Sequence, residues 1–324
     1  MNVEIATNKR LLFMAGRSNP ELAQEIADLL GTGLAQVEIN DFANGEIYVR
    51  ARENVRGADV FVFQTHTAPI NKSIVEQLVM IDAVKRASAK RITAVIPFYG
   101  YGRQDRKSRG REPITARLLA DMLTVAGADR VLSVDLHADQ IQGFFNKPFD
   151  HLTALTLFVN HFKERWSDDC VIVAPDAGRI RVAEKFASRL GASLAILHKR
   201  RRTDVRNVTE TALEVIGEVK GRRCVLVDDM VDTAGTLTGA ANVLSEFGAS
   251  EVYAAATHPI LSDPAIDRIK NSSIKELIVT NTLPIPPDKM IDKITVLSIA
   301  PVVADTVRAV FTEQSVSEIF DGTN

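Results

Sequence analysis

Short runs of apolar residues alternate along the chain with longer segments in which apolar residues recur every three or four positions. The short runs are rich in Val, Ile and Leu and have the length of strands that are buried on both faces. They lie at residues 11–15, 60–64, 92–98, 131–135, 171–174, 194–197, 225–227, 252–257, 277–280 and 294–299. Each run is predicted to be a strand of a parallel sheet.

The longer segments have the 3.6-residue period of helices with one apolar face. They lie at residues 20–30, 73–86, 114–125, 181–190 and 237–247. Asn19 can cap the amino end of the first of them, and Pro20 is its first residue, a common way to begin a helix. Strands that alternate with helices in this way are typical of parallel sheets with helices on both faces. The predicted fold class is therefore α/β.

The chain is long enough for two domains, since its 324 residues exceed the usual size of one. A Gly-Ala pair followed by Val and then His begins at Gly127 and recurs with the same spacing at Gly248. Glycine ends many helices, so such a short match also arises by chance and leaves a duplication open. We expect domains at 1–148 and 149–305, and a helix or tail at 306–324 that packs on the first domain.

The composition excludes several classes of protein. The chain has 39 Lys and Arg against 41 Asp and Glu, so neither nucleic acid nor a membrane is an expected partner. The two cysteines, Cys170 and Cys224, each begin an apolar run and cannot form a disulfide framework or a cysteine-rich zinc site. Residues 1–16 lack a signal-peptide pattern, and no run reaches the roughly 18 apolar residues of a membrane helix. A cytoplasmic protein is expected.

The run VLVDDMVDTAGTL places two adjacent aspartates directly after a predicted strand. Ligands of open α/β sheets bind beyond the carboxyl ends of strands, where the next helix offers unpaired N–H groups. Thr233, Gly235 and Thr236 can give such a site amides and hydroxyls for a phosphate. Asp228 and Asp229 would repel the phosphate, but their oxygens suit sugar hydroxyls, directly or through a divalent cation.

A phosphate site beside acceptors for hydroxyl groups indicates a sugar phosphate of the size of ribose 5-phosphate. The alternative is that Asp232 only caps the following helix and that the aspartate pair is a solvated strand end. The acids and the phosphate-loop residues occur together, and this coincidence favours the sugar-phosphate interpretation.

Two local clusters of positive charge stand out from the nearly neutral chain. RQDRKSRGR, at 103–111, has five Lys and Arg in nine residues, and KRRRTDVR, at 199–206, has five in eight. Such density causes repulsion that a bound anion relieves. Both clusters are also compatible with solvated surface loops, whereas a nucleic-acid patch conflicts with the overall charge.

Seven motifs together resemble those of the ribose-phosphate diphosphokinases, the synthetases of phosphoribosyl diphosphate. VLVDDMVDTAGT alone resembles the ribose-phosphate motif of type I phosphoribosyltransferases. The other six are FANGE, YGYGRQDRKSRGREPITA, DLHADQIQGFF, PDAG, HKRR and QSVSEIF. The resemblance covers nearly the full length and implies two similar phosphoribosyltransferase-like domains. It also implies transfer of the diphosphoryl group of ATP to the anomeric hydroxyl of ribose 5-phosphate, with release of AMP.

The resemblance implies which residues bind ATP. Phe42 would stack on the adenine of a neighbouring subunit in a homo-oligomer, which in this family is a hexamer built from dimers. Polar residues beside Phe42 would read the edge of the base, and Arg103 and Gln104 would bind the same ATP. The implied ATP-binding set is Phe42, Asn44, Gly45, Glu46, Arg103, Gln104, Asp105 and His137.

The same resemblance implies a Mg²⁺ cofactor held by His137 and Asp176, with ATP oxygens completing its shell. Lys199 and Arg201 are the implied catalytic pair, on a loop that closes over the site. Transfer of a phosphoryl-type group needs positioning and charge stabilisation more than covalent help, and cations supply both. The implied set for ribose 5-phosphate is Arg201, Asp228, Asp229, Asp232, Thr233, Ala234, Gly235 and Thr236.

Arg56, Ser315 and Ser317 match positions near an effector site for phosphate and ADP in relatives. A frayed terminus with ordinary serines is the alternative for the last two. The sequence also departs from the family pattern. Arg179 follows Gly178 where many relatives have a second glycine.

Two further departures are Ser108, where many relatives have an acid, and Asn44, where an aspartate is frequent. Neither removes a group that the reaction requires. Two other functions stay open. A phosphoribosyltransferase would need only about half this length and no FANGE motif, and a silent regulatory homologue would have lost the catalytic loop, whereas Lys199 and Arg201 are present.

Overall fold

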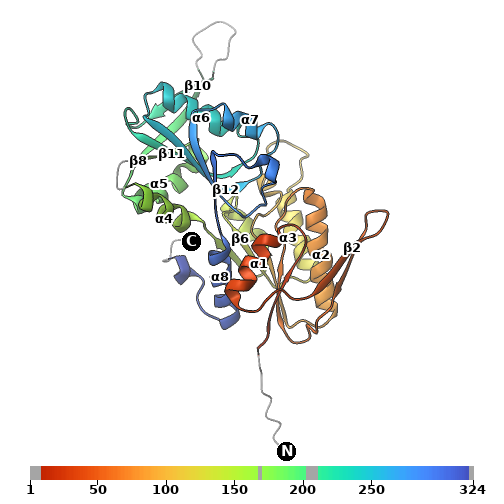
Figure 1. Cartoon of the computed structure of the whole chain (residues 1–324). Helices are drawn as coiled ribbons and strands as arrows, with labels where there is room; N and C mark the ends of the chain where they lie inside the picture. Colours follow the sequence, from red (N-terminus) through yellow and green to blue (C-terminus); the bar gives the residue numbers. More distant parts are fainter. Residues whose placement is uncertain (1–8, 167–169, 202–210, 321–324) are drawn as a thin grey trace, which may run out of the picture. The chain divides into compact units, whose positions relative to one another are not determined.

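The structure is a computed structural model that describes residues 9–166, 170–201 and 211–320, apart from the side chains of 199–201, 211–213 and 319–320. Figure 1 traces the chain from red at the amino end to blue at the carboxyl end. The chain divides into two compact units. Unit 1 contains Met1–Thr153, Thr282–Pro284 and Ile299–Asn324, and unit 2 contains Ala154–Asn281 and Ile285–Ser298. No described helix is long and apolar enough to cross a membrane.

The sheet of unit 1 has five parallel strands whose order in space follows their order in the chain. They are β1 (Leu11–Ala15), β4 (Asp59–Phe63), β5 (Arg91–Ile96), β6 (Arg130–Val134) and β7 (Phe149–Leu152). Every residue of β4 is buried, which is typical of a strand that is covered on both faces.

Four long helices belong to unit 1: α1 (Pro20–Leu30), α2 (Ile70–Arg86), α3 (Thr115–Ala126) and α8 (Ala300–Thr312). The predicted start of α1 is confirmed, because the side chain of Asn19 accepts a hydrogen bond from the N–H of Leu22 at 3.3 Å. Apolar residues of α2 and α3 share one core with the sheet. Helices α1 and α8 pack together, on the other side of the sheet from α2 and α3 (Figure 1).

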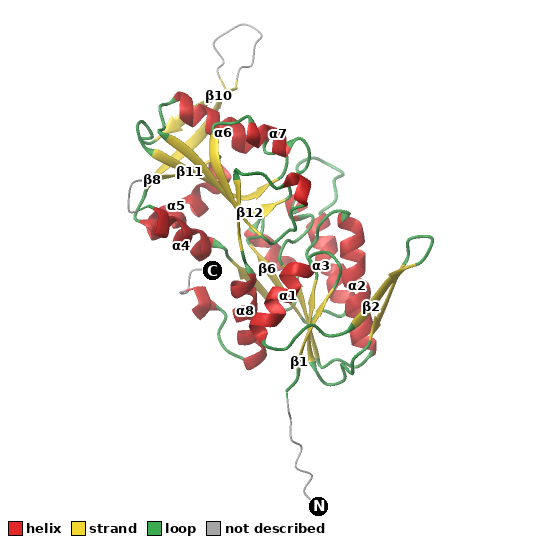
Figure 2. Ribbon diagram, in the orientation of Figure 1, coloured by secondary structure: helices red, strands yellow, loops and turns green. Residues whose placement is uncertain are grey.

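An antiparallel hairpin stands outside the main sheet of unit 1. It pairs β2 (Val37–Asp41) with β3 (Ile47–Ala51). None of its residues is buried, so its sequence lacks the continuous apolar run on which the strand predictions rested. The hairpin contacts α2 through β3 and projects from the rest of unit 1 (Figure 2).

The sheet of unit 2 has seven strands in the order β10-β9-β8-β11-β12-β13-β14, all parallel to their neighbours except β10. They are β8 (Cys170–Ala174), β9 (Ser193–Arg201), β10 (Thr211–Ile216), β11 (Arg223–Val231), β12 (Glu251–Pro259), β13 (Ile274–Thr280) and β14 (Ile294–Leu297). One face carries α4 (Leu155–Arg165) and α5 (Ile180–Leu190), and the other carries α6 (Gly235–Glu246) and α7 (Ala265–Lys270), as Figure 2 shows.

The strand order of unit 2 reverses at β8, because β9 follows β8 on one side and β11 lies on the other. In open α/β sheets the carboxyl ends of strands at such a reversal are the usual place for a ligand. The pairing of β11 with β8 stops at Leu226 and Val173, whereas its pairing with β12 continues to Val231 and Pro259. The last part of β11 therefore has a strand neighbour on one side only.

The α/β fold with two mainly parallel sheets is confirmed, but several bounds differ from the prediction. Unit 1 runs to Thr153 rather than 148, and the carboxyl-terminal helix begins at Ala300 rather than 306. Residues 299–305 therefore belong to unit 1, because α8 buries Val303 and Ala304 in that unit. The strands β2, β3, β7 and β10 and the helices α4 and α7 are absent from the predicted elements. Short 3₁₀ helices are η1 (Gly102–Gln104), η2 (Asp139–Phe144), η3 (Ala177–Arg179), η4 (Pro287–Lys289) and η5 (Ser317–Phe320).

Candidate active site

The aspartate pair lies in the part of β11 that extends beyond its pairing with β8. Asp229 is buried, and the side chain of Asp228 is 18% exposed. The N–H of Asp229 donates to Oδ1 of Asp228 at 2.8 Å. Two adjacent buried carboxylates repel each other and lose hydration, so they need a cation close by.

Arg179 supplies that cation from the loop after β8. Its Nε lies 3.0 Å from Oδ1 of Asp228, and its Nη2 lies 2.7 Å from Oδ1 of Asp229. The arginine side chain is itself only 12% exposed. These two nitrogens form one edge of the planar guanidinium group, so a single side chain spans both acids. A residue that the sequence marked only as a departure from the family pattern thus pairs with both aspartates.

The charge state of the acid pair depends on this contact. Burial raises the pKa of Asp228 above its usual range, and the neighbouring charge of Asp229 raises that pKa further. Arg179 has the opposite effect, because an adjacent positive charge stabilises the carboxylate form. Arg179, and after it the main-chain N–H of Asp229, favour the carboxylate form of Asp228.

The predicted phosphate-binding residues form the connection from β11 to α6. Thr233, Gly235 and Thr236 are exposed, and Ala234 is buried. Ala234 has a φ of 59°, a left-handed conformation that costs a residue with a side chain about 1 kcal/mol. This turn leads directly into α6, whose first N–H groups have no acceptor within the helix. Asp232 and these four residues thus form one loop at the amino end of a helix, an arrangement that favours anions.

Arg268 lies beside this loop, although nothing in the sequence pattern indicates it. Its Nη1 donates to the carbonyl oxygen of Thr233 at 2.9 Å. A Cβ added to Gly235 would lie 3.1 Å from the same nitrogen, so glycine permits the close approach. Arg268 adds a positive charge next to the loop, from a short helix 35 residues beyond Thr233.

Asp176 follows β8 in the same unit and is exposed. Its Oδ1 accepts a hydrogen bond from the N–H of Gly178 at 2.8 Å. A carboxylate has two oxygens, so this contact leaves acceptor capacity of the kind that a hard divalent cation prefers. Among the described residues, no three or more His, Cys, Asp or Glu side chains converge as a metal site. Any cation here therefore takes most of its ligands from elsewhere.

In unit 1, the FANGE residues form the turn of the β2–β3 hairpin. The N–H of Phe42 donates to the carbonyl of Glu46 at 2.8 Å, and the N–H of Gly45 donates to the carbonyl of Phe42 at 2.8 Å. Oδ1 of Asn44 accepts from the N–H of Glu46 at 3.2 Å. Gly45 has a φ of 89°, which glycine adopts without strain. Phe42 is 57% exposed, and its ring meets that of Tyr48 edge to face, at 6.2 Å between centroids.

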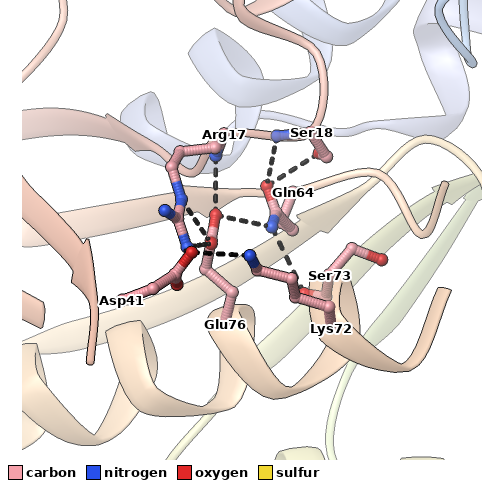
Figure 3. A network of polar contacts seen from close by, with 7 residues as sticks. All are labelled: Arg17, Ser18, Asp41, Gln64, Lys72, Ser73 and Glu76. Carbon is pink, nitrogen blue, oxygen red and sulfur yellow. Dashed lines mark hydrogen bonds and ion pairs between the residues drawn. The ribbon is translucent and has the colours of Figure 1, made fainter. Parts of the chain in front are cut away.

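A polar network fixes the base of this turn (Figure 3). At its centre is Glu76 of α2, whose side chain is 3% exposed. Arg17 donates its main-chain N–H to Oε1 of Glu76 at 2.7 Å and its Nε to Oε2 at 2.8 Å. Arg17 and Lys72 then hold the carboxylate of Asp41, at 2.8 and 2.6 Å. Asp41 is the last residue of β2 and directly precedes Phe42, so the network anchors the exposed phenylalanine to the body of unit 1.

Gln64 and Gly16 complete the network around Glu76. Nε2 of Gln64 donates to Oε1 of Glu76 at 3.0 Å, and Oε1 of Gln64 accepts from the hydroxyl of Ser18 at 2.7 Å. A Cβ at Gly16 would lie 2.4 Å from Oε1 of Gln64, so only glycine fits there. Hydrogen bonds from Arg17, and then from Lys72, lower the pKa of Asp41 to about 2, so this anchor is ionised at neutral pH.

The predicted ATP loop and His137 also meet within unit 1. Arg103 and Gln104 are exposed on η1, whereas Asp105 is buried and accepts a hydrogen bond from the amide of a glutamine in η2. A Cβ at Gly102 would lie 3.3 Å from Cβ of His137. Glycine at this position therefore lets the loop pass directly over His137, which is half-buried.

His66 supports the same loop, although no role is predicted for it from the sequence. Its Nδ1 accepts from the N–H of Gly100 at 2.9 Å, and its Nε2 lies 3.0 Å from Oε1 of Gln77. This pattern assigns the ring proton to Nε2. Burial lowers the pKa of His66 to about 4, so the ring is neutral at pH 7.

Comparison with known proteins identifies the family. Residues 11–127 match the N-terminal domain of ribose phosphate pyrophosphokinase, and residues 204–321 match a phosphoribosyl synthetase-associated domain. The ribose-phosphate pyrophosphokinase of Streptomyces coelicolor is 56% identical, over 98% of both chains. The chain belongs to the ribose-phosphate pyrophosphokinase family. The resemblance found in the sequence motifs is thus confirmed.

Further relatives support the family assignment and the fold. The ribose-phosphate pyrophosphokinase of Mycobacterium tuberculosis is 53% identical, over 97% of both chains. The crystal structure of phosphoribosylpyrophosphate synthetase from Mycobacterium smegmatis has 54% sequence identity and a TM-score of 0.89, and it covers 94% of this chain and 100% of that one. Matches of this length rule out a single-domain phosphoribosyltransferase.

The structure describes only the backbone of the two residues with an implied catalytic role. Lys199 and Arg201 lie at the end of β9, whose backbone pairs with β10 at these positions. Their side chains, and residues 202–210, lie outside the described part of the chain. Their catalytic role stays a prediction.

The three residues with an implied regulatory role are all exposed. The N–H of Arg56 donates to Oδ1 of Asn54 at 3.0 Å, in the turn before β4. The hydroxyls of Ser315 and Ser317 lie 2.9 Å apart, after the end of α8. An effector role for these residues stays a prediction.

Proposed function

We propose that this chain transfers the diphosphoryl group of ATP to the anomeric hydroxyl of ribose 5-phosphate, giving 5-phosphoribosyl 1-diphosphate and AMP. This product supplies nucleotide, histidine and tryptophan biosynthesis. The observation that carries the proposal is the 56% identity to a ribose-phosphate pyrophosphokinase over 98% of both chains. The acid pair next to a phosphate-type loop, at the reversal of strand order, supports a sugar phosphate as one substrate.

Ribose 5-phosphate is assigned to unit 2. Its phosphate accepts hydrogen bonds from the loop at 232–236, where the amino end of α6 favours an anion. Its ring hydroxyls donate to the carboxylates of Asp228 and Asp229, which lie at the end of the same strand. Arg268 stands close enough to Thr233 to add positive charge to the phosphate end.

ATP is assigned to residues of unit 1. The loop with Arg103, Gln104 and Asp105 runs over His137, and its cationic character suits a triphosphate. The exposed ring of Phe42 offers a stacking face for adenine from a second copy of the chain, with Asn44 and Glu46 in the same turn. A homo-oligomer, a hexamer in particular, is therefore part of the proposal.

A divalent cation, Mg²⁺, fits the donors that are present. Asp176 has an exposed carboxylate and His137 a half-buried imidazole, and an ion that keeps waters and phosphate oxygens needs few ligands from the protein. When bound, Mg²⁺ would neutralise charge on the phosphates of ATP. Asp176 is the better ligand of the two, because Mg²⁺ prefers oxygen.

The catalytic contribution of the protein is positioning and positive charge. The anomeric hydroxyl attacks the β-phosphorus of ATP, and AMP leaves as the bond to the α-phosphate oxygen breaks. Lys199 and Arg201 are proposed to stabilise the charge on the transferred diphosphoryl group. Phosphate and ADP are proposed effectors at Arg56, Ser315 and Ser317, and the cytoplasm is the proposed compartment.

The function is tested by the release of AMP from ATP, Mg²⁺ and ribose 5-phosphate. Lys199→Ala should lower kcat on the order of 10²- to 10³-fold, about 3 to 4 kcal/mol, because one charge that acts in the transition state is lost. Lys163, an exposed lysine of α4, provides the control Lys163→Ala.

Each outcome tests a different statement. A wild-type chain that releases no AMP would support a silent regulatory homologue and overturn the proposed function. A Lys199→Ala variant with near-normal kcat would remove only the catalytic assignment of Lys199. A changed melting temperature would show that Lys199 acts on folding instead.

A further inference from the structure

The most unusual contact in unit 2 is the one that Arg179 makes with both aspartates. In this chain the arginine side chain is 12% exposed and reaches Asp228 at 3.0 Å and Asp229 at 2.7 Å. An arginine charge this far removed from solvent depends on such close pairing.

The contact fixes the two carboxylates relative to each other. Nε and Nη2 project from one rigid edge of the guanidinium group, and each holds the Oδ1 atom of a different acid. Without the arginine, two adjacent carboxylates would turn apart to reduce their repulsion. With it, they are held side by side, and a carboxylate can accept more than one hydrogen bond.

We propose that Arg179 is a specificity-determining residue that sets the spacing of Asp228 and Asp229 for a sugar with two neighbouring hydroxyls. This inference rests on the proposed function, in which the pair binds the ring hydroxyls of ribose 5-phosphate. Ribose carries hydroxyls on C2 and C3, and two carboxylates at a fixed separation accept a hydrogen bond from each. A sugar that lacks the 2-hydroxyl leaves one carboxylate without its partner.

Arg179 acts through the acids and is a positioning residue. Its removal should therefore change the selectivity between sugar phosphates more than it changes the KM for ATP. Arg179→Gln keeps a polar side chain of similar reach but removes the charge and the rigid fork. The affinity for ribose 5-phosphate should fall about 100-fold, and the affinity for 2-deoxyribose 5-phosphate less than about 5-fold. The KM for ATP should change less than about 3-fold.

The experiment measures the binding of both sugar phosphates by calorimetry, together with AMP release from ribose 5-phosphate. Arg179→Lys is the second variant, because lysine keeps the charge and should fold, but one ammonium group cannot span both acids as a fork does. Its selectivity should lie between those of the wild type and Arg179→Gln. Arg181→Gln is the matched control, since Arg181 is an exposed arginine two residues further along.

The outcomes separate this inference from the proposed function. If the wild type releases no AMP, the function fails whatever Arg179 does. If the wild type is active and the Arg179 variants lose both sugars by the same factor, only the role in selectivity is overturned. A folded Arg179→Lys variant with wild-type selectivity would overturn it as well, even where Arg179→Gln fails to fold.

Discussion

The two units are built on similar parallel sheets, but the order of the strands in space differs between them. The strands of unit 1 follow one another in chain order, whereas those of unit 2 turn back at β8, with β9 on one side and β11 on the other. Such a reversal exposes the carboxyl end of a central strand to ligands. The proposed sugar site of unit 2 accordingly lies on a strand of the sheet, and the proposed nucleotide residues of unit 1 lie on a hairpin and loops outside it.

Each unit also pairs a buried acid with an arginine from the loop after a strand. In unit 1, both oxygens of Glu76 accept hydrogen bonds from Arg17, and one also accepts from Gln64. In unit 2, one guanidinium pairs with Oδ1 of both aspartates. The side chain of Glu76 is 3% exposed and anchors the hairpin, whereas that of Asp228 is 18% exposed, at the strand end where ligands of such sheets bind. The buried pair alone is therefore no sign of function.

The largest effect is expected from Asp229→Asn. Loss of this buried charge should lower kcat/KM for ribose 5-phosphate on the order of 10²- to 10³-fold, about 3 to 4 kcal/mol. Stability should stay the same or rise, because the change removes one of two buried like charges while Arg179 still pairs with Asp228. Steady-state kinetics and thermal unfolding check the two statements. A loss of activity that follows a lower melting temperature would contradict the comparison of the units.

The opposite result is expected from Glu76→Gln in unit 1. The free energy of unfolding should fall by roughly 2 to 3 kcal/mol, because hydrogen bonds to a buried charge are lost. The side chain of Arg17 is partly exposed, so water can still hydrate its charge. The KM for ATP should rise through the loosened hairpin, and the KM for ribose 5-phosphate should not. Urea unfolding and the two KM values are the measurements.

A control for this variant exists in the hairpin that contacts α2. Glu38 of β2 pairs with Arg52, the residue after β3, but both side chains are substantially exposed. Glu38→Gln should change stability by less than about 0.5 kcal/mol, because exposed ion pairs contribute little. If Glu38→Gln lowers the free energy of unfolding as much as Glu76→Gln does, burial is not what distinguishes the two acids.

The smallest expected effect is the change in stability at acidic pH. His66 has a pKa of about 4 in the folded chain, below its unfolded value of about 6.5, so its contribution to stability is present above pH 6.5 and is lost as the pH falls toward 4. Between pH 7 and pH 5 this loss is about 2 kcal/mol. Asp228 acts in the opposite direction, because its raised pKa means that protonation on acidification relieves the buried pair.

Urea unfolding at both pH values tests this difference between the units. Between pH 7 and pH 5, the change in stability of His66→Gln should be more favourable than that of the wild type by about 2 kcal/mol, since glutamine has no proton to gain. Asp228→Asn should shift the change in the opposite direction, because it removes the group that opposes His66. An identical pH dependence in the wild type and His66→Gln would show that the sensitivity lies elsewhere.

Local signals explain which elements can be predicted from the sequence. Helix α1 was predicted to the residue, because Asn19 and Pro20 mark its start and Gly31, with a φ of 71°, ends it. The hairpin could not be found in the same way. Its strands bury no residue, so their packing against α2 leaves no apolar run in the sequence.

The same reasoning applies to the site. The acid pair and phosphate loop are contiguous, so one motif identifies them. The contacts that decide what each acid does join residues far apart: Arg17 and Glu76 are separated by 59 positions, and Arg179 reaches acids on another strand. The pattern of residues in a sequence does not give the distances between side chains. Arg179 could therefore be recognised as unusual, but its contact with the aspartates could not be predicted.

The division of the chain also has a consequence for its biosynthesis. Unit 1 begins at the amino terminus but is completed by Ile299–Asn324. There α8 packs on α1, and Arg308 donates to the carbonyl of Leu29 at 2.9 Å. A ribosome that adds about 5 to 20 residues per second makes α8 roughly 15 to 50 s after α1. During that time the apolar side of α1 lacks the helix that packs on it, while unit 2 can already fold. The first unit to be started is thus the last to be finished, and a truncation at the carboxyl terminus damages the amino-terminal half.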